Sequence, residues 1–229
     1  MAVYAFSDLH GNYKLWTCIK NYLQENDIAY CLGDCCDRGP DGIKIMREVL
    51  RDKRIKYLKG NHEAMFVDAK DKTSKNMDAI DKQILRDNGT LETLRQYRQL
   101  HPKQQEKLIK RLERLPIKDI YINKENKKIF LSHAGCNPSN IFNREEKDFI
   151  WDRKHLSLDY WAWDSDLYIV HGHTPIQTLQ KSTKENPNAN QVLFYCDGHK
   201  IDIDVGSFIS NMIALINLDT FEVLYFFSW

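Results

Sequence analysis

Residues 33–39 read GDCCDRG, and they follow directly on the apolar run IAYCL at residues 28–32. An apolar run that ends in glycine and aspartate is typical of a strand followed by a loop. The same order recurs along the chain, as AVYAF before SDLHGN, IKYL before KGNHE, KIFL before SHAG, and LYIV before HGHTP. Open α/β sheets bind their ligands at loops that leave the carboxyl ends of strands. We therefore expect all of these loops to meet in one cleft.

Helical patterns separate the early strands. Apolar side chains recur at helical spacing over residues 12–26 and again over residues 41–52. This alternation predicts an α/β fold with parallel strand pairing in the first half of the chain. Residues 63–116 are helical in pattern and highly charged, so we interpret them as an inserted helical cap. Residues 192–227 predict antiparallel strands, with Asp197 and Gly198 in a hairpin turn.

The composition limits the class of protein. With 229 residues, of which 42% are hydrophobic, residues 1–229 can form a single domain around one core. A formal net charge of +1 gives no broad field for nucleic acid or a membrane surface, so we expect neither as a partner. The chain has no apolar stretch long enough to span a bilayer and no signal-peptide pattern at its start, which favours a cytoplasmic protein.

The cysteines do not indicate a disulfide framework. Six of them are scattered through the sequence without regular spacing, so we expect reduced thiols. Cys35 and Cys36 are neighbours, and neighbouring cysteines rarely form a disulfide because the ring is strained. They also lack the spaced pairing of a zinc site. We interpret both as small side chains that fill the turn between Asp34 and Asp37.

The loops carry oxygen and nitrogen donors of the kinds that bind metal ions. The candidate ligands are Asp8, His10, Asp34, Asn61, His133 and His173. Carboxylate, imidazole and amide groups suit divalent manganese, iron or zinc. Six donors fit two ions better than one. Asp8, His10 and Asp34 would hold one ion and Asp34, Asn61, His133 and His173 the other, so Asp34 would bridge the two.

A pair of metal ions favours the hydrolysis of phosphate esters. Two ions about 3.5 to 4 Å apart share a water, lower its pKa, and hold the oxygens of a phosphoryl group while the hydroxide attacks phosphorus. Arg38, Arg153 and the amide of Asn61 are the candidate phosphate-binding groups. The leaving alkoxide needs a proton, and His62 is the candidate general acid, oriented by Asp37.

The strings SDLHGN, GDCCDRGP, GNHE, HAG and HGHTP resemble the signature of calcineurin-like metallophosphoesterases. Within them the sequence is similar to the phosphoprotein phosphatase family, and most to its bacteriophage lambda type of serine/threonine phosphatase. The resemblance spans nearly the whole chain. It implies a central β-sandwich of two mixed sheets flanked by helices, and two metal ions usually supplied as manganese. It also favours His173 as the ligand over His171, because His173 follows the glycine as in the family pattern.

The resemblance leaves three functions open. The preferred function is a serine/threonine protein phosphatase, acting on phosphoproteins or small phosphate esters. The second is symmetrical hydrolysis of diadenosine tetraphosphate, whose enzymes resemble this chain but tend to carry alanine at the position of Asp37 and aspartate at that of Glu63. The third is a noncatalytic metal-binding or thiol redox protein. It is disfavoured because the ligands, both arginines and the acid are all present together.

Overall fold

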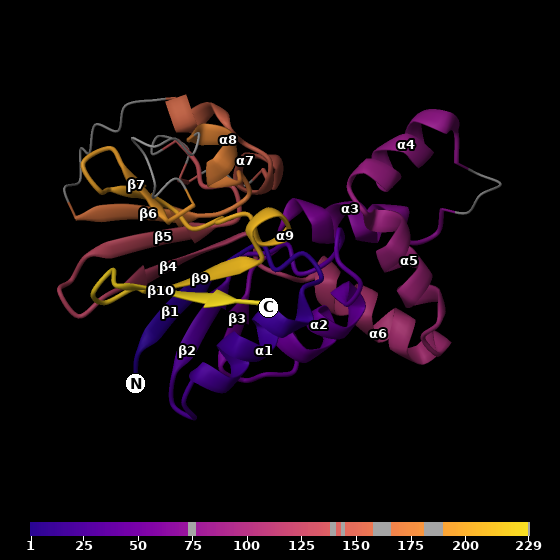
Figure 1. Cartoon of the computed structure of the whole chain (residues 1–229), viewed down its shortest axis with the longest axis horizontal. Coiled ribbons are helices and arrows are strands. Elements are labelled where there is room, and N and C mark those ends of the chain that lie inside the picture. Colours follow the sequence, from indigo (N-terminus) through magenta and orange to yellow (C-terminus); the bar gives the residue numbers. More distant parts are fainter. Residues whose placement is uncertain (73–76, 138–140, 143–144, 158–165, 181–189, 229) are drawn as a thin grey trace.

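The computed structural model describes residues 1–72, 77–137, 141–142, 145–157, 166–180 and 190–228. In this part of the chain, two five-stranded sheets stack face to face (Figure 1). The first sheet has the strand order β10 (Val223–Phe227), β9 (Met212–Asn217), β1 (Val3–Phe6), β2 (Ile28–Cys31) and β3 (Ile55–Tyr57). The second has the order β4 (Lys118–Ile122), β5 (Lys128–Ser132), β6 (Leu167–His171), β8 (Lys200–Asp202) and β7 (Leu193–Tyr195).

Helices flank the two sheets and form a separate block beside them (Figure 1). The helices packed near the sheets are α1 (Tyr13–Tyr22), α2 (Gly42–Val49), α7 (Lys147–Ile150), the short 3₁₀ helix Lys154–Ser157, α8 (Ile176–Leu179) and α9 (Ser207–Ser210). The helical block, between β3 and β4 in the chain, consists of α3 (Asn61–Ala69), α4 (Ala79–Asp87), α5 (Thr90–Arg98) and α6 (Pro102–Glu113). The block therefore corresponds closely to the helical insertion that the sequence predicts.

The alternation of side chains along β1 explains the layered packing. Val3 and Ala5 point into the core between the sheets, where they join residues such as Val170 of the second sheet. Tyr4 and Phe6 point to the other side and join the core beneath the helices. Because successive strand residues face opposite sides, one short apolar run fills two cores at once. The β-sandwich of mixed sheets implied by the family resemblance is confirmed.

The strand pairing agrees with most of the predicted pattern. β1, β2 and β3 pair in parallel, and β7 with β8 and β9 with β10 pair antiparallel. Asp197 and Gly198 lie in the turn between β7 and β8, both with positive φ. Two features were not predicted. The first is that β8 also pairs in parallel with β6. The second is β4, in which the exposed Ile120 and Ile122 alternate with polar residues, so no buried apolar run marks the strand.

The cysteines are free thiols in the structure. Cys35 and Cys36 are fully buried in the turn, and the sulfur of Cys35 lies 3.4 Å from that of Cys31. Burial raises the pKa of both Cys35 and Cys36, so these thiols stay protonated and behave as small apolar side chains. Among the helices of the described ranges, none has the length and apolar character needed to cross a membrane.

Glu48 fastens α1 to α2. It accepts hydrogen bonds from Tyr13 Oη at 2.9 Å, Trp16 Nε1 at 3.0 Å and Lys20 Nζ at 2.9 Å. These donors lie on one face of α1, spaced by about one and two helical turns. Burial alone would raise the pKa of Glu48, but the three donors outweigh it and lower the pKa from 4.5 to about 2. The ionised carboxylate is thus bound more favourably in the folded chain than in the unfolded one.

Glu48→Gln should lower the free energy of unfolding by about 1 to 2 kcal/mol at neutral pH, because a charged acceptor is lost. The folded pKa lies below the unfolded one, so the contribution is complete above the unfolded pKa of about 4.5 and is lost as the pH falls towards 2. Urea denaturation followed by circular dichroism from pH 7 to pH 3 would measure the difference. Glu106→Gln, which breaks an exposed pair with Lys110, is the control with little expected effect. A loss for Glu48→Gln that does not shrink at low pH would contradict the assignment.

Candidate active site

The predicted loops meet at one edge of the sandwich, around Asp34. The six candidate ligands are all nearly inaccessible to solvent. The Nε2 atoms of His10, His62 and His133 lie 3.8, 3.7 and 3.3 Å from Asp34 Oδ2. Asp8 Oδ1 lies 3.7 Å from His10 Nε2, on the first-ion side. Asp34 is therefore central in space, as its proposed bridging role requires.

The second group of donors is more tightly clustered. Asn61 Oδ1 lies 2.8 Å from His133 Nε2 and 2.9 Å from His173 Nδ1, and the two histidine nitrogens are 3.2 Å apart. Burial alone would lower the pKa of His133, but the nearby charge of Asp34 raises it to about 9. Burial and the neighbouring His133 lower the pKa of His173 to about 2. The surroundings of the His133 ring therefore favour a positive charge, whereas those of the His173 ring favour its neutral form.

Hydrogen bonds to main-chain carbonyls orient the ligand histidines. Nδ1 of His10 lies 3.1 Å from the carbonyl oxygen of Cys36, and Nδ1 of His133 lies 2.9 Å from that of Leu32. A carbonyl only accepts, so Nδ1 is the donor in each ring and Nε2 of the neutral ring keeps its lone pair for the site. Asp8 Oδ1 is buried without a hydrogen-bond partner in the described part of the chain. Converging acceptors of this kind fit divalent cations.

Left-handed backbone conformations aim these side chains at one point. Six of the eleven non-glycine residues with positive φ in the described ranges belong to the site: Asp8, His10, Asp34, Asp37, Arg38 and His173. Such conformations are uncommon and cost energy for residues with a Cβ. Main-chain hydrogen bonds between the loops that follow β1 and β2 hold them in place, including His10 N to Asp34 O at 2.9 Å.

Glu63 anchors the loop that carries Asp34, a role that the sequence did not reveal. Its buried carboxylate accepts hydrogen bonds from the amides of Asp34 and Cys35 at 2.8 Å and of Gly60 at 2.9 Å. The hydroxyl of Tyr57 donates to it at 2.8 Å. Burial and the charge of Asp34 raise the pKa of Glu63, whereas these donors oppose the rise. The sequence singled out Glu63 only through the family comparison and through its place two residues after a candidate ligand, and neither indicated these contacts.

His62 and Asp37 form a buried pair beside Asp34. Nδ1 of His62 lies 2.7 Å from Asp37 Oδ2, and the hydroxyls of Thr90 and Thr93 each donate to the Asp37 carboxylate at 2.6 Å. Burial alone would lower the pKa of His62, but the charges of Asp34 and Asp37 prevail and raise it. A histidine held in this way keeps a proton to donate. The two threonines, on α5, were missed because a polar residue at a helix start usually indicates a cap.

The two candidate phosphate-binding arginines lie beside different histidines. The guanidinium of Arg38 stacks on the ring of Phe208, 4.0 Å from its centroid. Burial and the neighbouring His62 lower the pKa of His10, and the charge of Arg38 adds to this effect. Nε of Arg153 donates to Thr174 Oγ1 at 3.2 Å, and its charge lowers the pKa of His173, after the larger effects of burial and His133. Both arginines are exposed. Phe208 was not singled out in the sequence, since an isolated aromatic residue carries no motif.

Gly89 and His171 complete the surroundings of the site. Gly89 has φ +77°, and a Cβ there would overlap the backbone of Arg38, so α5 packs closely against the loop that carries Arg38. His171 is fully buried, and its hydrogen-bond and ion-pair partners in the described ranges lie outside the set of candidate ligands. Its Nε2 lies 2.7 Å from the Tyr195 hydroxyl and its Nδ1 lies 3.0 Å from the Gly172 carbonyl oxygen. This placement supports His173, rather than His171, as the ligand.

The sequence pattern that defines the calcineurin-like phosphoesterases matches residues 1–205. The chain therefore belongs to this family of metal-dependent phosphoesterases, and its site carries candidate ligands for the metal.

Relatives within the family have two kinds of name. Over 214 residues the chain is 27% identical to the asymmetrical bis(5'-nucleosyl)-tetraphosphatase of Oceanobacillus iheyensis, covering 77% of this chain and 78% of that protein. Over 212 residues it is 26% identical to serine/threonine-protein phosphatase 2 of Escherichia coli, covering 84% and 91%. A solved structure provisionally named as a diadenosine tetraphosphatase superposes with a TM-score of 0.66 at 15% identity, covering 100% of this chain and 94% of that one. The likeness to the solved structure shows the fold, the match over residues 1–205 shows the family, and the substrate is left to other arguments.

Asp34→Asn should weaken the binding of both metal ions, because the substitution removes the charge of the carboxylate shared by the two groups of donors. The metal content of protein dialysed against manganese, measured by elemental analysis, would test this. Asp119→Asn, on the partly exposed side chain of β4, is the control that should leave the content unchanged. If Asp34→Asn retains manganese at wild-type affinity, Asp34 is not a bridging ligand.

Proposed function

We propose that this protein is a metal-dependent phosphomonoesterase that removes phosphate from phosphoserine and phosphothreonine side chains of proteins. The observation that carries the proposal is the 2.7 Å contact between His62 and Asp37. A serine or threonine alkoxide is a poor leaving group and needs a proton as the ester bond breaks. Cleavage of a phosphoanhydride releases a phosphate group, which leaves with less assistance. A buried, oriented acid therefore supports a monoester substrate.

Each group of the site has a role in this proposal. Asp8, His10 and Asp34 would hold one divalent ion, and Asp34, Asn61, His133 and His173 would hold the other. When bound, the ions supply a water of lowered pKa and positive charge beside the phosphate. Manganese is the proposed metal, although iron and zinc suit the same donors. Arg38 and Arg153 bind the phosphate oxygens, with the Asn61 amide beside them. His62 delivers its proton to the leaving oxygen while Asp37 fixes the ring.

Hydrolysis of a dinucleoside tetraphosphate such as diadenosine tetraphosphate is the second candidate. Relatives with that name cover most of this chain. One structural feature also favours it. An open hollow of about 470 Å³ adjoins Arg38 and is lined by the exposed ring of Phe208 and by Asn12 and Asn211, which could receive a nucleoside.

Hydrolysis by metal-stripped protein, with and without added manganese, would separate the two candidates, measured as inorganic phosphate from the peptide and as mononucleotides by chromatography from the dinucleotide, whose splitting releases no free phosphate. The substrates are a phosphoserine peptide and diadenosine tetraphosphate, assayed side by side. We expect manganese-dependent release of phosphate from the peptide at the higher kcat/KM. Preferential splitting of the dinucleotide would make the nucleotide hydrolase the correct function, and inactivity on both would reject both candidates.

His62→Asn should reduce kcat for a phosphoserine peptide by about 10² to 10⁴, because the alkoxide then leaves without a proton donor. The loss on p-nitrophenyl phosphate should be smaller, since nitrophenolate is a good leaving group. His101→Asn is a matched control: His101 is exposed at the start of α6, where asparagine also serves as a cap. Equal losses on the two substrates would contradict the role of His62 as general acid.

A further inference from the structure

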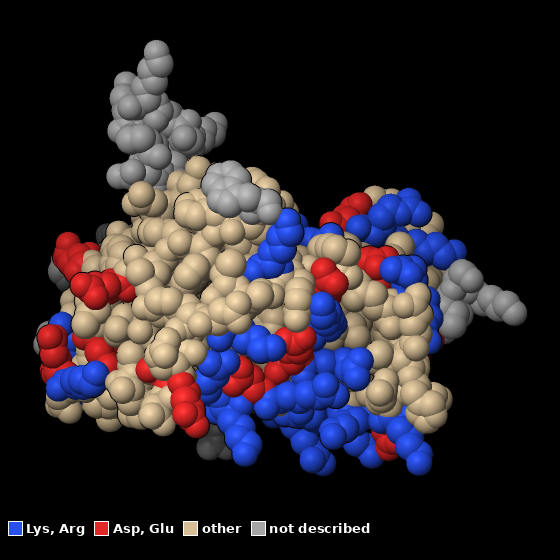
Figure 2. All heavy atoms as spheres, turned by 60° about the horizontal axis from the view of Figure 1, so that its bottom comes forward, with Lys and Arg blue, Asp and Glu red and all other residues tan. Residues whose placement is uncertain are grey.

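Three hollows lined partly by Lys and Arg side chains lie between the active site and α6. Figure 2 shows Lys and Arg side chains gathered on the face that carries α1, α2 and α6. The first hollow lies beside Arg38 and is also lined by Lys14 and Asp41. The second has a volume of about 440 Å³ and is lined by residues of α2 from Ile43 onward. A smaller hollow between α2 and α6 shares residues with the second. We call the last two the α2–α6 groove, lined by Lys44, Arg47, Leu50, Arg51, Lys107, Leu108 and Arg111, among others.

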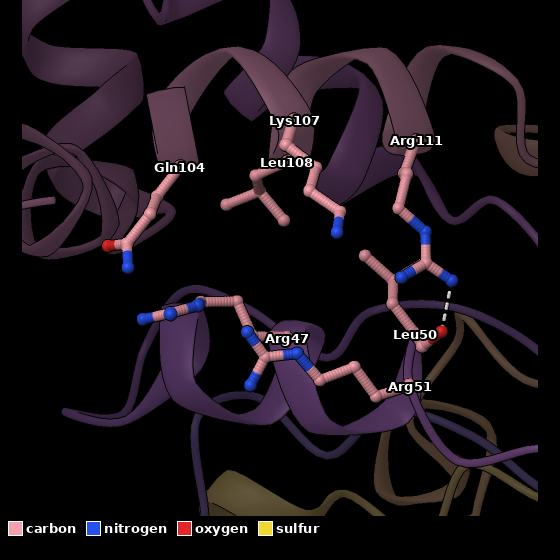
Figure 3. Close-up of a pocket in the computed structure, with 7 residues that line it drawn as sticks. All are labelled: Arg47, Leu50, Arg51, Gln104, Lys107, Leu108 and Arg111. Atoms are coloured by element: carbon pink, nitrogen blue, oxygen red, sulfur yellow. Dashed lines mark hydrogen bonds between the residues drawn. The ribbon is translucent and has the colours of Figure 1, made fainter. Parts of the chain in front are cut away.

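The groove presents cations without acidic partners. Figure 3 shows Arg47 and Arg51 of the α2 segment facing Lys107 and Arg111 of α6. No acidic group pairs with any of these four within the described ranges, and the Arg111 guanidinium donates to the carbonyl oxygen of Leu50. Glu48 also lines the groove, but its carboxylate is engaged by donors of α1, and the nearby Glu106 pairs with Lys110. In a chain with a net charge of only +1, this concentration of positive charge is local and attracts anions.

The floor of the groove is aliphatic. Leu50 and Leu108 lie between the two rows of cations. The residues that line the groove include no aromatic side chain, so it lacks the stacking surfaces on which proteins bind single-stranded nucleic acid. Carboxylates flanking one apolar side chain would match both the cations and the floor. This combination of charge and apolar surface favours an acidic peptide segment over RNA.

The groove lies within reach of a peptide bound at the phosphate site. α2 begins at Gly42, shortly after Arg38, and Arg51 lies just beyond its end. The eight residues of α2 rise about 12 Å, a distance that an extended peptide covers in about four to six residues. A protein substrate could therefore occupy both places at once, whereas an isolated phosphoserine could not.

We propose that the α2–α6 groove docks an acidic segment of the phosphoprotein substrate, with one apolar side chain of that segment seated on Leu50 and Leu108. The segment lies about five residues or more from the phosphorylated serine. The proposal rests on the proposed phosphatase function, since the docked segment and the phosphate belong to one polypeptide.

Two phosphopeptides that differ only in the distant segment would test the proposal. Both carry the same phosphoserine and a flexible spacer of about five residues. One ends in a leucine flanked by aspartate and glutamate, and the other in the same leucine flanked by asparagine and glutamine. We expect the acidic peptide to have a KM about tenfold lower at equal kcat, the effect of a few exposed charge pairs. The advantage should decrease in high salt.

The ratio of the two kcat/KM values, measured in each variant, removes general effects on folding and catalysis. In Arg47→Glu/Arg51→Glu the ratio should fall to about one or below, and in the milder Arg47→Gln/Arg51→Gln it should fall part of the way. Lys82→Glu/Arg86→Glu, on α4 at the far end of the helical block, makes the same change in net charge and should keep the wild-type ratio.

Direct binding separates this proposal from the proposed function. Fluorescence anisotropy of the acidic segment without phosphoserine should show binding that Arg47→Glu/Arg51→Glu abolishes and Lys82→Glu/Arg86→Glu retains. Binding without hydrolysis of either phosphopeptide would reject the phosphatase function and keep the groove as a site for acidic peptides. Hydrolysis of both at the same KM would overturn the docking proposal and keep the function. Displacement of the segment by an RNA oligonucleotide of equal charge at lower concentration would also overturn it, in favour of nucleic acid.

Discussion

The buried carboxylate of Glu63 is the constraint on which the site depends. It accepts the amides of Asp34 and Cys35 from the loop after β2 and the amide of Gly60 from the loop after β3. It thereby ties two neighbouring strand ends together through one charged group, and those ends carry Asp34 and Asn61. An unpaired charge at this depth would be strongly destabilising, but four hydrogen bonds, with Tyr57 the last, compensate its desolvation. The geometry of the candidate metal site is thus determined by a residue that would bind no metal itself.

The two packed cores of the sandwich explain how strained residues are tolerated at the strand ends. The left-handed conformations of Asp8, His10 and Asp34 each cost energy locally. They persist because the strands on either side are fixed in two cores, one between the sheets and one beneath the helices. These conformations turn the polar side chains towards the site, whereas in a continuing strand successive side chains would point to opposite faces of the sheet. The packing of the sandwich stabilises the fold enough to offset the backbone strain that preorganises the site.

The sequence predicted those parts of the fold and site that depend on local pattern. Apolar runs followed by polar loops located β1, β2, β3, β5 and β6, and the recurrence of such loops indicated that they meet around Asp34. What it missed depends on contacts between distant segments. The two threonines of α5 that bind Asp37, and Phe208 beneath Arg38, gain their roles only when α5 and α9 pack beside the loop after β2. β4 escaped notice because its side chains are partly exposed, and pairing with β5 rather than a buried apolar run defines it as a strand.

The two-sheet sandwich and the helical block contribute different residues to the site. The loops that leave the strands supply the candidate metal ligands, except Asn61, which begins α3. The helical block reaches the same site from the side: α5 holds Asp37 and packs on Arg38 through Gly89, and α6 forms one wall of the basic groove. Relatives at 26% and 27% identity are named for phosphoprotein and dinucleotide substrates, so membership of the family does not determine the substrate. The helical block contributes residues that contact Asp37 and the backbone of Arg38 and residues that line the basic groove. The helical insertion is therefore the part of this chain in which we expect substrate choice to be encoded.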